Sequence, residues 1–307
     1  MSNLSKPHFH DEQAAYDFVE ARIWPNGATC PKCGERERVS KMGGASTRIG
    51  TYKCYKCRKP FTVKVGTVFE SSHVKMHVWL QAIYLMCASK KGTSSNQLHR
   101  TLGVTLKTAW FMSHRIREAM RDGVLGPMGG GKGSTVEVDE TFIGRDPLKK
   151  VRRGPSHKLK VLSLVDRKSG RVRSMVVGNL KVNTIVPILL ENIEREAAVY
   201  TDEAIHYAKL HEDFEKHASV NHSQDEYVRG TISTNTVEGY FSIFKRGMKG
   251  TYQHCAKHHL HRYLAEFDFR YSNRANLAVN DERRAEIALS GIVGKRLTYE
   301  TTRSRAN

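Results

Sequence analysis

The chain has 307 residues, in which 50 Lys and Arg stand against 31 Asp and Glu, a formal net charge of +19. This length allows two or three small domains with their own cores, and the charge predicts a polyanionic partner, most simply nucleic acid. A merely basic soluble protein is the alternative. No apolar run reaches the roughly 18–20 residues that cross a bilayer, and the first residues lack the apolar segment of a signal peptide. We therefore expect an intracellular protein that does not contact membrane.

Four of the six cysteines form two C-x-x-C pairs separated by twenty residues. Two such pairs at this distance are typical of a zinc ribbon, in which four thiolates bind one structural Zn²⁺. Disulfide bonds are the alternative, but nothing in the sequence indicates secretion. We assign the ribbon, with a short amphipathic helix over residues 10–24, to an N-terminal domain at 1–69. The predicted zinc ligands are Cys30, Cys33, Cys54 and Cys57.

The pattern over residues 70–125 predicts helices. Ser94 or Ser95 can cap a short helix, and Gly103 can form the tight turn that ends it. Thr105 can then cap a second helix, which completes a helix–turn–helix pattern. An αα-hairpin that packs without contacting DNA is the alternative. The side chains expected to face DNA lie on the second helix and are Lys107, Thr108, His114, Arg115 and Arg117.

A glycine-rich run at 126–134 predicts a flexible linker, and a third domain follows it at 135–275. A hairpin meander followed by alternating helices and strands is the order of the ribonuclease-H-like α/β fold. The polar tail at 276–307 is expected to be peripheral. The predicted elements are strands at 134–143, 158–166 and 171–178, a helix at 182–195, a strand at 197–201, a helix at 203–211, a short strand at 218–220, and helices within 231–250 and 254–273.

Three acidic residues stand where this fold could bring them together. Asp139 and Asp202 each follow a short β-branched run that predicts a buried strand, and Glu238 lies on an amphipathic helix with 35 residues between it and Asp202. Clustered carboxylates bind hard divalent cations such as Mg²⁺. Two such metals, about 3.5–4 Å apart, activate water against a phosphodiester. An ordinary solvated helix face is the alternative for Glu238, which shares its face with Asn235 and Lys245.

Four segments carry a resemblance to a known family: W-P-N-G-A-T-C-P-K-C-G, V-E-V-D-E-T-F-I-G, Y-T-D-E-A and N-T-V-E-G-Y-F-S-I-F-K-R-G. Over nearly its whole length the chain resembles the zinc-ribbon DDE transposases of prokaryotic insertion sequences, the ISXO-like group. The resemblance implies that Asp139, Asp202 and Glu238 are catalytic and bind Mg²⁺ or Mn²⁺ at a two-metal site. It also implies that Lys245, with Arg246, contacts DNA. Asn235 stays open as the third catalytic residue, because some members of the group use asparagine there.

The function that the resemblance implies is transposition. Such a transposase binds the ends of its insertion sequence and catalyses metal-dependent strand cleavage and 3′-OH strand transfer. Its expected partners are double-stranded DNA, both at the ends of the element and at the target, and a second copy of the chain in a homodimer or larger assembly. Its expected location is the cytoplasm, in association with the nucleoid. Two alternatives stay open: a DNA-binding regulator derived from a transposase, and a ribonuclease-H-like nuclease without strand transfer. The intact acidic residues argue against the regulator, and the N-terminal DNA-binding region argues against the nuclease.

Overall fold

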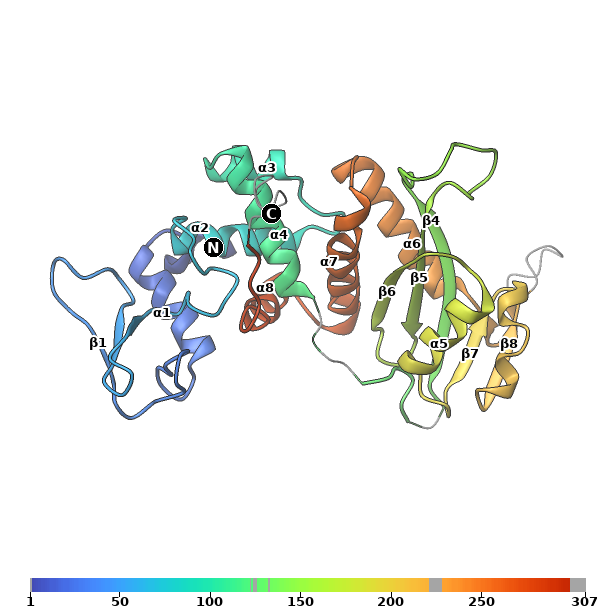
Figure 1. Ribbon diagram of the computed structural model, residues 1–307, viewed down its shortest axis with the longest axis horizontal. Coiled ribbons are helices and arrows are strands. Elements are labelled where there is room, and N and C mark those ends of the chain that lie inside the picture. The colour runs from blue at the N-terminus through green and yellow to red at the C-terminus, as the bar shows by residue number, and fades with distance from the viewer. Residues whose placement is uncertain (1, 122, 124–125, 132, 221–227, 299–307) are drawn as a thin grey trace, which may run out of the picture. The chain divides into compact units, whose positions relative to one another are not determined.

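The computed structural model describes residues 2–121, 123, 126–131, 133–220 and 228–298, which form two compact units (Figure 1). The N-terminal unit comprises 1–89, 93–121 and 280–307, and the sheet unit comprises 90–92 and 122–279. Lys132 of the predicted linker and residues 299–307 of the predicted tail lie outside the described residues. Within the described part of the chain, no helix is long and apolar enough to cross a membrane.

The N-terminal unit begins with helix α1 (Glu12–Ile23) and a small antiparallel sheet in the order β1 (Val39–Lys41), β2 (Tyr52–Cys54) and β3 (Pro60–Phe61). The Asp11 side chain caps α1 by accepting a hydrogen bond from the Ala14 N–H. Two of the cysteines, Cys30 and Cys54, share the core of this sheet with Phe61. A core this small is a poor source of stability on its own, which is the situation in which a bound metal stabilises a fold.

Helices α2 (Met76–Ala88), α3 (Ser95–Leu102) and α4 (Leu106–Met120) follow. The predicted caps are confirmed: Ser94 accepts from the Gln97 N–H, and Thr105 accepts from the Thr108 N–H. Gly103 ends α3 in the left-handed conformation, with φ of 66°, which glycine adopts without a steric penalty. The sequence therefore specifies this pair of helices and the turn between them through local signals.

The prediction of a peripheral polar tail is wrong. Residues 281–290 form helix α8 (Asp281–Ser290), which packs against α2 and buries Ala288 and Leu289. Arg284 is also buried and donates from Nη1 to the Cys87 carbonyl oxygen at 2.9 Å. The buried residues of this helix are Arg284, Ala288 and Leu289, which stand among polar neighbours, so an average of its polarity does not reveal that it packs.

The sheet unit contains five strands in the order β6-β5-β4-β7-β8. The central strand β4 pairs antiparallel with β5 and parallel with β7, and β7 pairs parallel with β8. The strands are β4 (Thr135–Ile143), β5 (Leu159–Asp166), β6 (Val172–Val177), β7 (Ala198–Thr201) and β8 (Lys216–Ser219).

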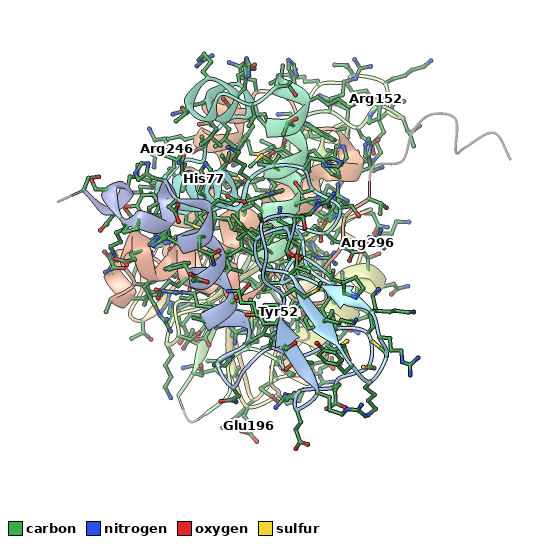
Figure 2. The ribbon with its side chains drawn as sticks, turned by 90° about the vertical axis from the view of Figure 1, so that its left-hand side faces the viewer. Tyr52, His77, Arg152, Glu196, Arg246 and Arg296 are labelled. Carbon is green, nitrogen blue, oxygen red and sulfur yellow. The ribbon has the colours of Figure 1, made fainter. Side chains whose placement is uncertain are left out.

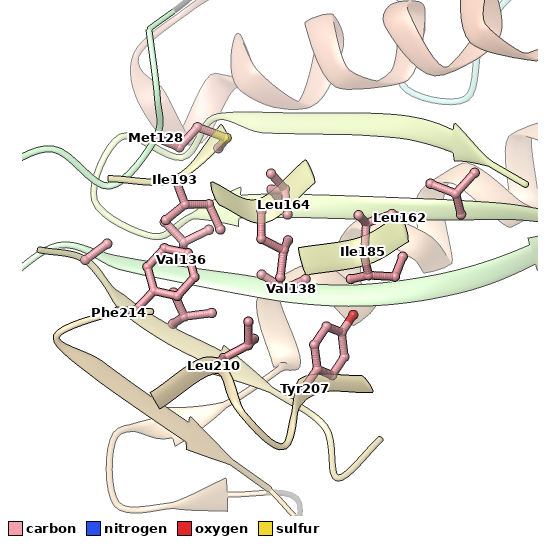
Figure 3. Packing of buried hydrophobic residues seen from close by; sticks show 14 residues of the cluster. Met128, Val136, Val138, Leu162, Leu164, Ile185, Ile193, Tyr207, Leu210 and Phe214 are labelled. Atoms are coloured by element: carbon pink, nitrogen blue, oxygen red, sulfur yellow. The ribbon is translucent and has the colours of Figure 1, made fainter. Parts of the chain in front are cut away.

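Helices cover both faces of this sheet. On one face, Val138 and Leu162 pack against Ile185 of α5 (Val182–Asn192), as Figure 3 shows. On the other face, the core includes Val161 and residues of α6 (Asn235–Gly247) and α7 (Leu260–Ser272). Adjacent residues of a strand point to opposite faces, so Val161 and Leu162 enter different cores. A two-stranded ribbon, β9 (Val228–Arg229) and β10 (Ile232–Ser233), leads into α6.

Two further predictions for this unit are wrong. The predicted helix at 203–211 consists of two single 3₁₀ turns, Ile205–Tyr207 and Leu210–Glu212. The glycine-rich run is not a free linker, because Met128 is buried and exchanges backbone hydrogen bonds with Asn192 and Glu194. Glycine is required there for close approach: a Cβ at Gly129 would stand 2.6 Å from the Ala197 Cβ.

Candidate active site

Three carboxylates meet at the end of β7. Asp139 and Glu140 lie in the middle of β4, Asp202 follows β7 directly, and one carboxylate oxygen from each lies within 4.8 Å of the others. The pairing of β4 with β7 covers only Thr135–Glu137 of β4, so the strand edge beside Asp139 is open. This open edge explains how neighbours on one strand, which normally point to opposite faces, can both reach Asp202.

The environment of Asp139 and Asp202 disfavours their ionisation. Burial raises the pKa of Asp139 to about 8, and the negative charges of Glu140, Asp202 and Glu238 contribute to the rise. Burial likewise raises the pKa of Asp202, helped by the charge of Glu140. Carboxylates whose pKa is raised by burial and by neighbouring negative charges are stabilised in the ionised form by a cation. Their oxygen atoms are the donors that Mg²⁺ and Mn²⁺ prefer, so the cluster fits a divalent metal.

Glu140 is a member of the cluster that the sequence predictions missed. It is nearly buried and is hydrogen-bonded to the Nε2 of His206, which lies in the 3₁₀ turn after Asp202. The charge of Glu140 also contributes to raising the pKa of buried Tyr207. Strand alternation places Glu140 on the face opposite Asp139, and for that reason the sequence pattern does not single it out. Its signal in the sequence is its place directly after Asp139, in a strand that carries a third acidic residue, Glu137.

The predicted residues of α6 lie outside this tight group. Asn235 begins the helix and Glu238 lies one turn later, both exposed, and the Glu238 Oε1 accepts from the Thr234 hydroxyl at 3.2 Å. Glu238 is near enough for its charge to raise the pKa of Asp139. Lys245 and Arg246 are exposed in the last turn of α6. Helical spacing puts Lys245 on the same face as Glu238, nearly two turns away.

A buried carboxylate fixes the start of α6 against β4. Glu137 is fully buried and accepts hydrogen bonds from the backbone N–H groups of Thr236 and Val237 at 2.8 and 2.9 Å. Arg167 pairs with the same carboxylate at 2.5 Å and donates to the carbonyl oxygens of Thr231 and Ser233. A negative charge at a helix N-terminus is favourable, because the first N–H groups have no partner within the helix. The position of Glu238 relative to Asp139 is set here.

A second anchor joins α6 to β6 through α7. Asp268 of α7 accepts from the Ser174 N–H at 2.8 Å, from the Ser174 hydroxyl at 2.7 Å and from the Tyr240 hydroxyl at 2.5 Å. Tyr240 is buried in the middle of α6. Hydrogen bonds to a charged acceptor are the stronger ones in proteins. The helix is therefore held at its start and at its centre.

The four predicted zinc ligands come together. The Sγ atoms of Cys30 and Cys57 are 3.7 Å apart, those of Cys33 and Cys54 are 3.6 Å apart, and all four are free thiols within 4.8 Å of one another. Four thiolates around Zn²⁺, each at 2.3 Å, stand about 3.8 Å apart at the corners of a tetrahedron. The residues therefore fit a structural zinc ion, as the ribbon pattern predicts.

Three of the five side chains predicted to face DNA from α4 are buried, and for these the prediction is wrong. His114, Arg115 and Arg117 are inside the unit, and Arg115 donates from Nη1 to the carbonyl oxygens of Val68 and Glu70, each at 2.8 Å. The physical reason is that α4 contacts α2, α3 and α8, and so has more buried faces than the second helix of a two-helix motif. Lys107 is exposed, and Thr108 is half-buried.

Two family models match this chain, and two relatives resemble it. Residues 130–272 match the family model of the ISXO2-like transposase domain, and residues 10–60 match the transposase zinc-ribbon domain. An uncharacterized protein in the transposable element ISH50 of Halobacterium salinarum is 30% identical over 284 residues, 85% of this chain and 91% of its own. An uncharacterized transposase-like protein of Haemophilus influenzae is 27% identical over 103 residues, 34% of this chain and 82% of its own.

A chain in the cryo-EM structure of the simian T-cell lymphotropic virus intasome, in complex with the PP2A regulatory subunit B56 gamma, covers 56% of this chain and 63% of its own. Its identity is 13% and its TM-score 0.28, which is too low to support an argument. The two domain matches place the protein in the class of DDE transposases that carry a zinc ribbon. More particularly, the chain belongs to the ISXO2-like transposase family.

Proposed function

We propose that this chain is the transposase of an insertion sequence, and that it binds the element's ends, cleaves a DNA strand and joins the new 3′-OH to target DNA. The observation that carries the proposal is the meeting of Asp139 and Asp202 on neighbouring strands, with the pKa of each raised. Supporting it, the strand order β6-β5-β4-β7-β8, with β4 in the centre, is the order expected of a ribonuclease-H-like domain.

Each residue has a role in this proposal. Asp139 and Asp202, joined by Glu140, would hold Mg²⁺ or Mn²⁺, and the bound metal supplies activation of the attacking oxygen and neutralisation of developing charge. Glu238 of α6 is the third catalytic residue in this proposal. We favour it over Asn235 because its negative charge contributes to the raised pKa of Asp139. Lys245 places an ammonium group on the same helix face, where a DNA phosphate can bind. Catalysis then depends on positioning and electrostatics, without a covalent enzyme intermediate.

The N-terminal unit supplies end binding in this proposal. The helix pair α3–α4 presents Lys107 and Thr108 near the start of its second helix, where helix–turn–helix proteins contact base edges. Exposed basic side chains surround the zinc ribbon and can neutralise phosphates. Because two ends have to be joined, we propose a homodimer or larger assembly on paired ends, acting in the cytoplasm on nucleoid DNA. The ribbon basic residues are Lys32, Lys56, Arg58 and Lys59.

The test uses the purified full chain and a labelled duplex of the element's end. Wild type with Mg²⁺ or Mn²⁺ should nick this duplex and produce joined strands. The Asp139→Ala and Asp202→Asn variants should bind the duplex with unchanged affinity and leave it intact. Cleavage retained in either variant would overturn the assignment of the site. Tight binding without cleavage by any of the proteins would instead indicate a regulator.

A further inference from the structure

The connection between β4 and β5 is the most basic exposed segment of the sheet unit. We define it as the basic arm, residues 144–158, which extends beyond the ends of the two strands (Figure 1). It contains one acidic residue, Asp146, against six lysines and arginines. Four of these cations are exposed, and Figure 2 labels one of them, Arg152. The four are Arg145, Lys150, Arg152 and Arg153.

The single acid of the arm does not compensate these cations. Asp146 is buried at the base of the arm, where it pairs with Lys257 at 3.1 Å and accepts from the Leu148 N–H at 3.2 Å. Its own N–H donates to the His157 carbonyl oxygen, which closes the base. Within the described residues, none of the four exposed cations forms an ion pair. By contrast, Arg167 and Arg270 in the same unit are paired with buried carboxylates.

Two large apolar side chains are exposed among these charges. Leu148 is 86% exposed and Val151 is 61% exposed, and they alternate with the cations in the sequence L-K-K-V-R-R. A second copy of this chain is a poor partner for the arm, because a chain of net charge +19 repels it. A DNA groove suits both features, since phosphates line its edges and apolar side chains can contact sugars and base edges inside it.

We propose that the basic arm is a DNA-contacting element of the sheet unit, in which Lys150, Arg152 and Arg153 bind phosphates while Leu148 and Val151 enter the groove. The inference rests on the proposed function only in that the chain binds double-stranded DNA. The arm begins five residues after Asp139 along β4, a distance of about 17 Å. One duplex can therefore reach both the carboxylate cluster and the arm, whose base lies roughly five base pairs from the cluster.

The test measures DNA binding by the full chain in an Asp202→Asn background, without added divalent metal, by fluorescence anisotropy over a range of KCl concentrations. Three proteins are compared: this parent, an arm variant and a control variant with the same change in charge elsewhere on the sheet unit. The arm variant is Lys150→Gln/Arg152→Gln/Arg153→Gln, and the control variant is Lys168→Gln/Lys181→Gln/Lys209→Gln, three exposed lysines.

The arm variant should bind at least tenfold more weakly at 100 mM salt. The slope of log affinity against log salt concentration should decrease by about 2–3, since each lost phosphate contact contributes about 0.9. The control variant should keep the parent's slope, and so should a Lys150→Arg/Arg152→Lys/Arg153→Lys variant, which keeps the charges. An unchanged slope in the arm variant, or an equal loss in the control, would overturn the inference.

The apolar pair gives an independent test. A Leu148→Ser/Val151→Ser variant should bind DNA more weakly with no change of slope, because the lost contacts are not ionic. Unchanged DNA binding with an altered oligomeric state would mean that the arm contacts protein, and would overturn the inference. Failure of the proposed chemistry can be told apart from failure of this inference. It would appear as a wild-type protein that neither cleaves nor joins DNA, and it would not depend on the salt dependence of DNA binding in the arm variants.

Discussion

Glu137 and Asp139 stand two residues apart on β4: Glu137 anchors the start of α6, and Asp139 belongs to the carboxylate cluster beside it. Glu137 binds the first N–H groups of α6, and Asp139 lies within the electrostatic reach of Glu238 from that helix. Residues at i and i+2 of a strand share a face of the sheet. Strand β4 therefore carries both Asp139, which belongs to the carboxylate cluster, and Glu137, which fixes α6. Helix α6 in turn carries Glu238, the proposed third catalytic residue.

Replacing the buried anchor should destabilise the sheet unit. Glu137→Gln removes the negative charge, so Arg167 loses its carboxylate partner and keeps only its neutral acceptors. We expect the free energy of unfolding to fall by about 3 kcal/mol, the lower end for a broken buried ion pair, because Arg167 is partly exposed. Urea denaturation of the full chain measures it. The matched control is Glu191→Gln, an exposed residue of α5, which should change stability by less than about 0.5 kcal/mol. Equal stability of the two variants would show that the anchor contributes nothing.

The raised pKa of Asp139 predicts a pH dependence for the metal-free protein. Its pKa is about 8 in the folded state, against about 3.9 unfolded, so between these values the folded protein retains a proton that the unfolded chain has lost. Stability should therefore fall as pH rises from about 4 to 8, with a slope of up to about 1.4 kcal/mol per pH unit from this group. In Asp139→Asn this contribution should disappear. Parallel stability curves for wild type and variant would contradict the account.

Metal binding should depend on Glu140 as well as on the two aspartates. Mn²⁺ titration followed by electron paramagnetic resonance should show binding to wild type, and Asp139→Asn or Asp202→Asn should abolish it. Glu140→Gln should weaken it at least roughly tenfold, the effect typical of groups that support a metal site. Glu196→Gln, an exposed residue before β7, is the control and should leave the isotherm unchanged. Wild-type affinity in Glu140→Gln would remove this residue from the site.

Loss of zinc should affect the N-terminal unit. Purified protein should contain one equivalent of zinc, and Cys54→Ser should lose it together with the ribbon's protection from proteolysis, because ribbon folding and metal binding are coupled. End binding should weaken in the same variant. Cys255→Ser, outside the ribbon, should retain both zinc and binding. Full zinc content and full binding in Cys54→Ser would contradict the structural role.

Local signals in the sequence were sufficient for much of this structure. The cysteine spacing predicted the ribbon, Ser94, Gly103 and Thr105 predicted the boundaries of two helices, and the β-branched runs predicted a strand at Asp139 and a strand before Asp202. These features depend on spacing, capping and backbone conformation, which are properties of short segments. The amphipathic pattern likewise predicted the helix of Glu238, now bounded as Asn235–Gly247.

Features that depend on tertiary packing were not predictable in this way. Burial of Arg115 follows from the packing of α4 within its unit, which includes the distant helix α8. Glu140 joins the cluster because β7 ends early and leaves the edge of β4 open. The role of Glu137 requires that α6 begin directly beside it, one hundred residues later in the chain. In each case the deciding neighbour is far away in sequence.

In the proposed mechanism a 3′-OH is the attacking group, and strand joining from a pre-cleaved end measures this step by itself. Wild-type protein, Mg²⁺ or Mn²⁺ and a target plasmid are incubated with a labelled end that carries either a 3′-OH or a 3′-deoxy terminus. We predict joined product from the 3′-OH end only, and none from either end with Asp202→Asn. Equal joining of the 3′-deoxy end, or metal-dependent nicking without any joined product, would contradict the transposase mechanism.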